Sequence, residues 1–411
     1  MKRKIYIVHH GARDEYKVAA ELSKDVRFDV HLITTGYPPK WLSRLSVFNR
    51  FRLFRKLLAR EKSDLRTVNI RSNLILEIIL RALGKLFGEG WYLDKMDKGI
   101  ARSFFAGFQP EDCAYVLAYN YNGFRIFSDK RLAGVRKVLF MCHPHPVFCR
   151  AVLEKYMQAG VIPSLSGEKE FSYAPSYLAR QIAEPTLASE IICASTLTKV
   201  SLEQYSGNAV PIKVIPYGVD RKFKYFDHGP MREEGSFSRP LNILFVGQFS
   251  FRKGINLLEK ILQKVRQPVN MILVGRGMRE YEVEPRAIGS GHSLEVFWDV
   301  PFKDLVSIYS RSDVFLFPTL LEGFGLVILE AMLAGVVPVT TSMSCATDVI
   351  RDGVDGFVRD PSDIDGMAES LNTLAADRVL LGRMSSSTSA RAESYSWDRF
   401  GAELRSSLHV Q

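Results

Sequence analysis

The sequence predicts an α/β protein of two domains, and three observations support this. The chain has 411 residues, which is too long for one core and suits two domains of about 200 residues each. Apolar runs that look like buried strands alternate with segments of helical periodicity, a pattern typical of parallel sheets covered by helices on both faces. Apolar residues make up 46% of the chain, as in an ordinary globular protein.

The elements of the first half follow from short apolar runs. The basic start of the chain leads into only four apolar residues, which indicates a first β-strand rather than a secretion signal. A helix follows this strand. The sequence contains no run of 18 apolar residues, so no membrane-spanning helix is predicted. We expect strands at residues 5–8, 28–34, 115–119, 138–141 and 190–195.

The strand at 138–141 ends in a segment rich in histidine and cysteine. His143 and His145 alternate with prolines there, and Arg150 follows. In open α/β sheets ligands bind at the carboxyl ends of the strands, so these side chains are candidates for a binding site. Two alternatives stay open. One is a metal site that also uses Cys142 and Cys149, although the spacing of these residues fits no zinc pattern. The other is that the histidines only make hydrogen bonds within the loop.

The second half contains a cationic loop between a strand and a helix. A buried strand at 241–247 ends on Gly247, and Arg252 and Lys253 precede a helix predicted from residue 255. Arginine can hold phosphate oxygens with two hydrogen bonds, and lysine adds a point charge. The alternative is that Arg252 and Lys253 are an ordinary basic pair on the protein surface with no binding role. A further strand at 271–274 runs into Gly275. A glycine at a strand end is by itself a weak indication of a phosphate-binding turn.

Two carboxylates, Glu322 and Glu330, frame a Gly-Phe-Gly turn that leads from a strand into a helix at 326–333. The free N–H groups at a helix start favour an anion, and glycine lets the backbone approach it. Carboxylates repel a phosphate, so their presence beside a phosphate site indicates a second function. Accepting hydrogen bonds from sugar or ribose hydroxyls would be such a function. Solvent-exposed glutamates are the alternative.

These residues, in this order, resemble the glycosyltransferases of family 4, which have the GT-B fold. The match consists of Gly247 with the loop 252–254, the turn at 274–275, Glu322 and Glu330 around Gly-Phe-Gly, and the hinge 215–220, and it extends over residues 188–361. The resemblance implies two Rossmann-like domains that face a central cleft, with a C-terminal helix that crosses back to the first domain. The expected units are 1–217 for the acceptor, 218–395 for the donor, and the helix at 396–411.

The resemblance also implies roles for single residues. Arg252 and Lys253 would neutralise the donor diphosphate, Glu322 would bind donor-sugar hydroxyls, and His143, or secondly His145, would contact the sugar. Arg150 would lie on the acceptor side. The remaining donor-binding residues would be Gly11, Gly247, Gly275, Gly323, Phe324, Gly325, Leu326 and Glu330. Only Gly11 remains of the glycine-rich loop that the family often has after the first strand.

Charge is concentrated in the first half of the chain. Residues 1–200 contain 32 Lys+Arg and 19 Asp+Glu, a net of +13, and residues 40–62 contain eight basic residues with Glu61 as their one acid. Aromatic and aliphatic residues recur there at near-helical spacing, and 72–87 is a second amphipathic segment. Both could bind an anionic membrane surface, or their apolar stripes could pack on the core. No nucleic-acid motif occurs, so no nucleic acid partner is expected.

Together these features predict a retaining glycosyltransferase that moves a sugar from a UDP-, GDP- or ADP-sugar to a lipid-linked or glycan acceptor. The two cations make a metal ion or other cofactor unnecessary. Five cysteines without framework spacing indicate reduced thiols and a cytoplasmic protein, for which a peripheral position on the inner membrane face is the option left open. The alternatives are another GT-B enzyme on activated sugars, an epimerase or phosphorylase, and an inactive membrane-docked scaffold.

Overall fold

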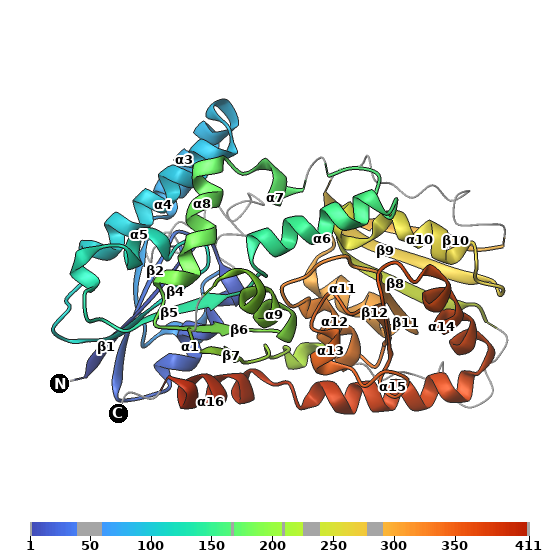
Figure 1. The fold of residues 1–411 in the computed structure, drawn as a ribbon. Helices are drawn as coiled ribbons and strands as arrows, with labels where there is room; N and C mark the ends of the chain where they lie inside the picture. The colour runs from blue at the N-terminus through green and yellow to red at the C-terminus, as the bar shows by residue number, and fades with distance from the viewer. Residues whose placement is uncertain are drawn as a thin grey trace, which may run out of the picture.

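The computed structural model describes residues 2–38, 60–165, 168–207, 210–224, 239–277 and 291–408. Two parallel sheets, of seven and six strands, lie side by side and are each covered by helices (Figure 1). The two-domain α/β architecture expected from the sequence is therefore present. The predicted basic segment 40–62 lies outside the described residues, except for its last three.

The first sheet has the strand order β3-β2-β1-β4-β5-β6-β7, with every neighbouring pair parallel. Its central strand β4 is buried along its whole length, as expected where helices cover both faces. The strands are β1 Arg3–His9, β2 Phe28–Thr34, β3 Asn69–Ser72, β4 Cys113–Tyr119, β5 Lys137–Met141, β6 Glu190–Cys193 and β7 Ile212–Val214.

The helices of this domain differ in length and role. Two long helices, α3 and α4, form a hairpin that rises away from the sheet in Figure 1. The short α7 lies on the side of the domain that faces the second sheet. The helices are α1 Lys17–Ser23, α3 Leu74–Phe87, α4 Glu89–Phe105, α5 Phe124–Phe127, α6 Pro146–Gln158, α7 Lys169–Ser172, α8 Pro175–Ala183 and α9 Thr196–Tyr205.

The second sheet has the order β10-β9-β8-β11-β12-β13 and is again parallel. Its strands are β8 Leu241–Phe249, β9 Val269–Gly277, β10 Ser293–Trp298, β11 Val314–Phe317, β12 Val337–Thr341 and β13 Phe357–Arg359. Its helices are α10 Ile255–Leu262, α11 Phe302–Ser310, α12 Leu326–Leu333, α13 Ala346–Val349, α14 Ile364–Ala376 and α15 Arg378–Glu393.

The last helix, α16 (Trp397–Ser407), returns to the first domain, which confirms the expected crossing (Figure 1). It packs on α1, where Arg405 Nη1 lies 3.0 Å from Glu21 Oε2. The chain passes between the domains near Val219 and again near Tyr395. The two segments are hydrogen bonded, since the Val219 N–H donates to the Tyr395 carbonyl at 2.9 Å. Among the described residues, no helix is long and apolar enough to cross a membrane.

Candidate active site

Arg252, Lys253 and Glu322 converge at the carboxyl ends of β8 and β11. Arg252 Nη1 donates to Glu322 Oε1 at 3.0 Å, and Lys253 forms an ion pair with the same oxygen. The turn that carries the two cations ends at Gly254, where φ is +74° and a Cβ would lie 2.0 Å from the Pro318 carbonyl oxygen. Only glycine therefore lets this turn lie against the end of β11.

The site is buried but charged. Burial opposes ionisation of Glu322, yet Lys253 and Arg252 outweigh it and hold the pKa of Glu322 below its ordinary value. Burial lowers the pKa of Lys253, although Glu322 opposes this. Glu322 is 9% exposed, so the three charges lie in a region of low dielectric, where their interaction is stronger than in water.

The first domain adds two carboxylates that the sequence analysis did not identify. Glu168 Oε1 accepts the Arg252 backbone N–H at 3.0 Å, and its Oε2 lies 3.7 Å from Arg252 Nε. Glu170 Oε1 lies 3.6 Å from His143 Nε2. In the sequence these glutamates belong to a run of small and charged residues that reads as a solvated loop, and no local signal marks them.

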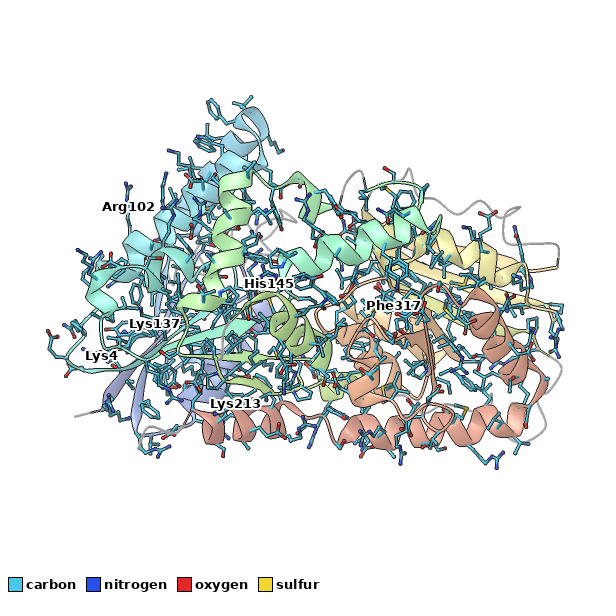
Figure 2. All side chains as sticks on the ribbon, in the orientation of Figure 1. Lys4, Arg102, Lys137, His145, Lys213 and Phe317 are labelled. Atoms are coloured by element: carbon cyan, nitrogen blue, oxygen red, sulfur yellow. The ribbon has the colours of Figure 1, made fainter. Side chains whose placement is uncertain are left out.

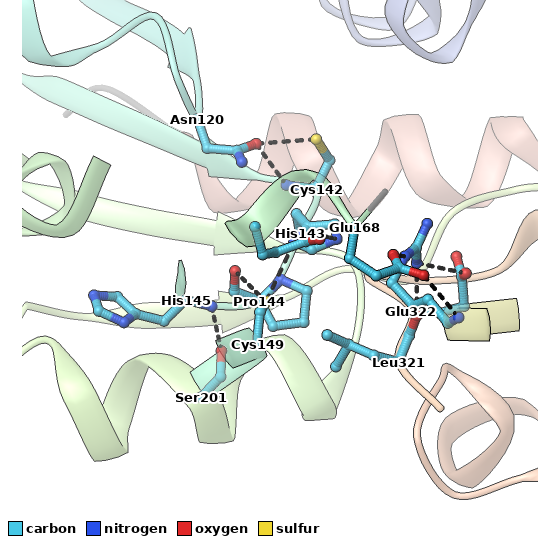
Figure 3. A network of polar contacts seen from close by, with 12 residues as sticks. Asn120, Cys142, His143, Pro144, His145, Cys149, Glu168, Ser201, Leu321 and Glu322 are labelled. Carbon is cyan, nitrogen blue, oxygen red and sulfur yellow. Dashed lines mark hydrogen bonds and ion pairs between the residues drawn. The ribbon is translucent and has the colours of Figure 1, made fainter. Parts of the chain in front are cut away.

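His143 lies on the first-domain side of this cluster. Figure 3 shows it beside Glu168 and facing Glu322 across the space between the domains. Burial lowers the pKa of His143, while Glu170 opposes the shift, so the ring is neutral near pH 7. A neutral imidazole can both donate and accept a hydrogen bond, as contact with a sugar hydroxyl requires.

His145 and Arg150 are not brought to this cluster. His145 points away from Glu322 in Figure 3, and its ring stacks on Tyr205 at a centroid distance of 5.9 Å. Its Nδ1 accepts the Val147 N–H at 3.3 Å and so caps α6. Arg150 lies on α6, 4.0 Å from Glu154 of the same helix.

The four residues weighed as a metal site do not point to one place. Cys142 Sγ donates to Asn120 Oδ1 at 3.0 Å, whereas Cys149 Sγ lies 3.5 Å from His143 Nδ1. His145 is turned to the other side, as Figure 3 shows. The described residues contain no group of three or more side chains placed to hold a metal ion.

The turn before α12 is pressed against the first domain. A Cβ at Gly323 would lie 2.0 Å from the Cys142 carbonyl oxygen, so only glycine fits there. The Gly323 carbonyl accepts hydrogen bonds from Ser195 Oγ at 2.5 Å and Thr198 Oγ1 at 3.3 Å, both at the start of α9. The predicted turn is thus a contact between the two domains.

The helix after this turn begins at Leu326, as predicted, and Gly325 at its start has φ +90°. Phe324 is buried against Tyr217, with ring centroids 5.2 Å apart. Glu330 lies one and a half turns into the helix and accepts a hydrogen bond from Tyr309 Oη at 3.3 Å.

Glu330 and Leu326 line a cavity of about 130 Å³ between the domains, together with Phe302, Val219 and Lys17. Burial raises the pKa of Glu330 to about 7, and the nearby Glu15 and Asp220 act in the same direction. A carboxyl group in a small cavity can exchange hydrogen bonds with hydroxyl groups. The role of Glu330 at the ribose stays a prediction.

Two of the predicted glycines, Gly247 and Gly275, lie inside their strands, because β8 and β9 each run two residues past the glycine. Gly247 and Gly275 are register partners on β8 and β9, and Gly275 lies against the Phe249 ring. Gly11 follows β1 with φ +71°, and its N–H donates to Thr35 Oγ1 at 2.9 Å. None of these three is among the residues that line the cavity at Glu330.

The second domain is similar to known proteins. Residues 231–392 match the model of the family glycosyl transferases group 1. The phosphatidyl-myo-inositol mannosyltransferase of Mycolicibacterium smegmatis is 31% identical over 195 residues, which cover 46% of this chain and 50% of that protein. The chain spans half or less of the length of the first three curated relatives that it matches.

Several solved structures match almost the whole chain in fold. Sucrose-phosphate synthase from Thermosynechococcus elongatus has a TM-score of 0.66 at 16% identity and covers 98% of both chains. HepE of Anabaena, in complex with UDP and glucose, has a TM-score of 0.62 at 18% identity and covers 99% of both. The protein therefore has the GT-B fold.

Proposed function

We propose that the protein is a retaining glycosyltransferase that transfers a sugar from a nucleotide-sugar donor without a metal ion. The observation that carries this proposal is the convergence of Arg252, Lys253 and Glu322 before α12, opposite His143. The match of residues 231–392 to the glycosyl transferases group 1 supports it. The likeness to a structure that holds UDP and glucose favours a nucleotide-sugar donor, among UDP-, GDP- and ADP-sugars.

The residues divide the work of the reaction by their chemistry. Arg252 and Lys253 take the negative charge that develops on the leaving diphosphate, which is the largest electrostatic contribution such a site can make. Glu330 holds the ribose hydroxyls, and Glu322 turns from the two cations to hydroxyls of the donor sugar. His143, neutral near pH 7, hydrogen bonds to the sugar from the first domain.

The acceptor in this proposal is a lipid-linked or glycan molecule held by the first domain at the cytoplasmic face of a membrane. The similarity to a protein named phosphatidyl-myo-inositol mannosyltransferase supports an acceptor with a lipid part. The excess of 13 positive charges in residues 1–200 suits an anionic surface.

Calorimetric titration with UDP-, GDP- and ADP-sugars tests the donor site. We expect one nucleotide class to bind the wild type and binding to be lost in Glu330→Ala. The matched control is Glu295→Ala, an exposed glutamate on β10 of the same domain that pairs with Arg311. A folded wild type that binds no donor would contradict the proposal and favour an inactive scaffold.

His143→Ala tests the division of work between the domains. We expect this variant to lose sugar transfer while its nucleotide affinity stays nearly unchanged, because the histidine contacts the sugar and not the nucleotide. Equal loss of both would make the loop structural. Isomerisation of the donor sugar without an acceptor, or a requirement for free phosphate, would instead indicate an epimerase or a phosphorylase.

A further inference from the structure

Helix α3 presents its apolar side chains to the outside of the molecule. Of the twelve exposed large apolar residues among the described residues, six lie on this one helix. Leu86 and Phe87 are 79% and 61% exposed. The six are Ile75, Leu76, Ile78, Ile79, Leu86 and Phe87. A surface helix of a globular protein normally turns such a stripe inward.

The orientation of α3 is held by specific contacts. Leu74 and Leu80 are buried, and Glu77 between them is only 4% exposed and pairs with Arg81 at 2.9 Å. The helix packs on α4, where Gly84 lies so close to Tyr92 that a Cβ would be 2.9 Å from the tyrosine Cβ. The outward apolar face is therefore built into the hairpin, since the opposite face carries the contacts.

Most of the exposed charges around this face are positive. Five exposed side chains on α3 and α4 are basic and a single one, Glu89, is acidic. Of the other acids of the hairpin, Glu77 and Asp94 pair with two of these bases, Arg81 at 2.9 Å and Lys98 at 2.7 Å. Asp97 is buried and pairs with Arg125 at 2.7 Å. Figure 2 shows one of the basic residues, Arg102, at the outer edge of α4. The five are Arg81, Lys85, Lys95, Lys98 and Arg102.

The turn of the hairpin adds aromatic rings to the basic residues. The Phe87 and Trp91 ring centroids lie 5.1 Å apart, and Lys95 Nζ lies 5.7 Å above the Trp91 ring. Tryptophan is enriched where hydrocarbon meets headgroups, and a basic rim beside an apolar face is typical of helices that lie in the membrane interface. At about 21 Å, α3 is too short to span a bilayer.

We propose that the apolar face of α3 inserts into the surface of an anionic lipid membrane, with the basic residues of the α3–α4 hairpin on the lipid phosphates. The surplus of exposed positive charge selects this occupant over a second copy of the same basic chain. The inference rests on the proposed function and deepens it, because membrane contact by the first domain would bring its acceptor side to a lipid-linked acceptor. Helix α3 lies within the amphipathic segment 72–87, for which the sequence left membrane contact and core packing as alternatives, and the exposed apolar face favours membrane contact.

Co-sedimentation with phosphatidylcholine vesicles, with and without phosphatidylglycerol, tests this proposal on the full chain. The test variant carries Ile75→Ser, Ile79→Ser, Leu86→Ser and Phe87→Ser. The matched control replaces four exposed valines elsewhere, Val26, Val200, Val354 and Val379, with serine. We expect the wild type and the control to bind phosphatidylglycerol vesicles, and the α3 variant to lose at least about tenfold in partitioning, because each buried apolar group contributes to binding.

A charge variant, Lys85→Gln with Lys95→Gln and Arg102→Gln, should also bind more weakly and lose most of the salt dependence. Wild type that does not bind anionic vesicles, or an α3 variant that binds as well as wild type, would overturn the proposal. A concentration-dependent mass in solution that the α3 variant abolishes would assign the face to a second copy. Donor titration in the absence of vesicles is a separate readout, so failure of the donor site and failure of the membrane face are distinguishable.

Discussion

Replacing Glu168 with glutamine should strengthen donor binding. Glu168 Oε1 accepts the Arg252 backbone N–H at 3.0 Å, and its Oε2 lies 3.7 Å from Arg252 Nε. Glu168 and Glu322 both lie against Arg252, and Glu322 also pairs with Lys253, so carboxyl groups already contact the cations that would hold the donor diphosphate. The carboxylate of Glu168 therefore competes with the donor for Arg252 and must withdraw when the donor binds.

The size of the effect follows from the contact that is weakened. A hydrogen bond to a charged group contributes about 1.5–3 kcal/mol, and one between neutral groups about 0.5–1.5 kcal/mol. Glutamine keeps the shape and the acceptor oxygen but removes the charge, so the competition weakens by about 1 kcal/mol. This corresponds to a Kd for the nucleotide that is about fivefold lower.

Calorimetric titration with the nucleoside diphosphate measures this change. The control is Glu154→Gln, an exposed glutamate whose partner Arg150 lies on the same helix, and it should leave the Kd unchanged. A Kd that is equal or higher in Glu168→Gln than in the wild type would refute the reasoning. Glu168 would then support the binding-competent shape of the site instead of occupying it.

Three further predictions concern turnover, domain contact and pH. Lys253→Ala should lower kcat about 10²- to 10³-fold in a single-turnover assay, since a charge placed at the leaving group stabilises the transition state by about 3–4 kcal/mol; unchanged turnover would remove Lys253 from this role. Gly323→Ala should lower the free energy of unfolding by about 1–3 kcal/mol in urea, because its Cβ would meet the Cys142 carbonyl, whereas Gly382→Ala, with nothing within 4 Å, should not. Equal midpoints for the two variants would contradict the close approach. The pKa of Glu330, raised to about 7, means that its stabilising contribution is complete below its unfolded pKa and is lost as pH rises through about 7. Glu330→Gln should therefore be more stable than wild type above about pH 7, by about 1–2 kcal/mol after allowing for partial exposure, and a difference that does not change with pH would contradict this.

Local patterns in the sequence were enough to predict many elements of the fold. The strand expected at 28–34 is β2 Phe28–Thr34, and the helix expected at 326–333 is α12 Leu326–Leu333. In both cases the apolar period and the flanking residues act within one short segment. The gathering of Arg252, Lys253 and Glu322 at one edge of the sheet could also be predicted, because parallel strands bring their carboxyl ends together there, but their ion pairs could not.

The parts that the sequence could not predict depend on contacts between distant segments. Glu168 lies 84 residues before Arg252, and nothing local distinguishes it from a solvated glutamate. His143 and His145 are two residues apart in one loop, and only the packing of His145 on Tyr205 separates them. The left-handed backbone of Asp14, Glu15 and Tyr16 beside the cavity is equally imposed by its surroundings, since non-glycine residues rarely adopt it.

The return of α16 to the first domain has a consequence for folding during synthesis. Arg405 and its partner Glu21 are separated by 384 residues, and Gly401 packs against the same glutamate. At about 5–20 residues per second, Glu21 emerges from the ribosome roughly 20–80 s before the arginine that pairs with it. The surface of the nascent first domain that α16 covers therefore stays exposed until the entire second domain has been translated. A circular permutant that places α16 ahead of β1 would remove this wait.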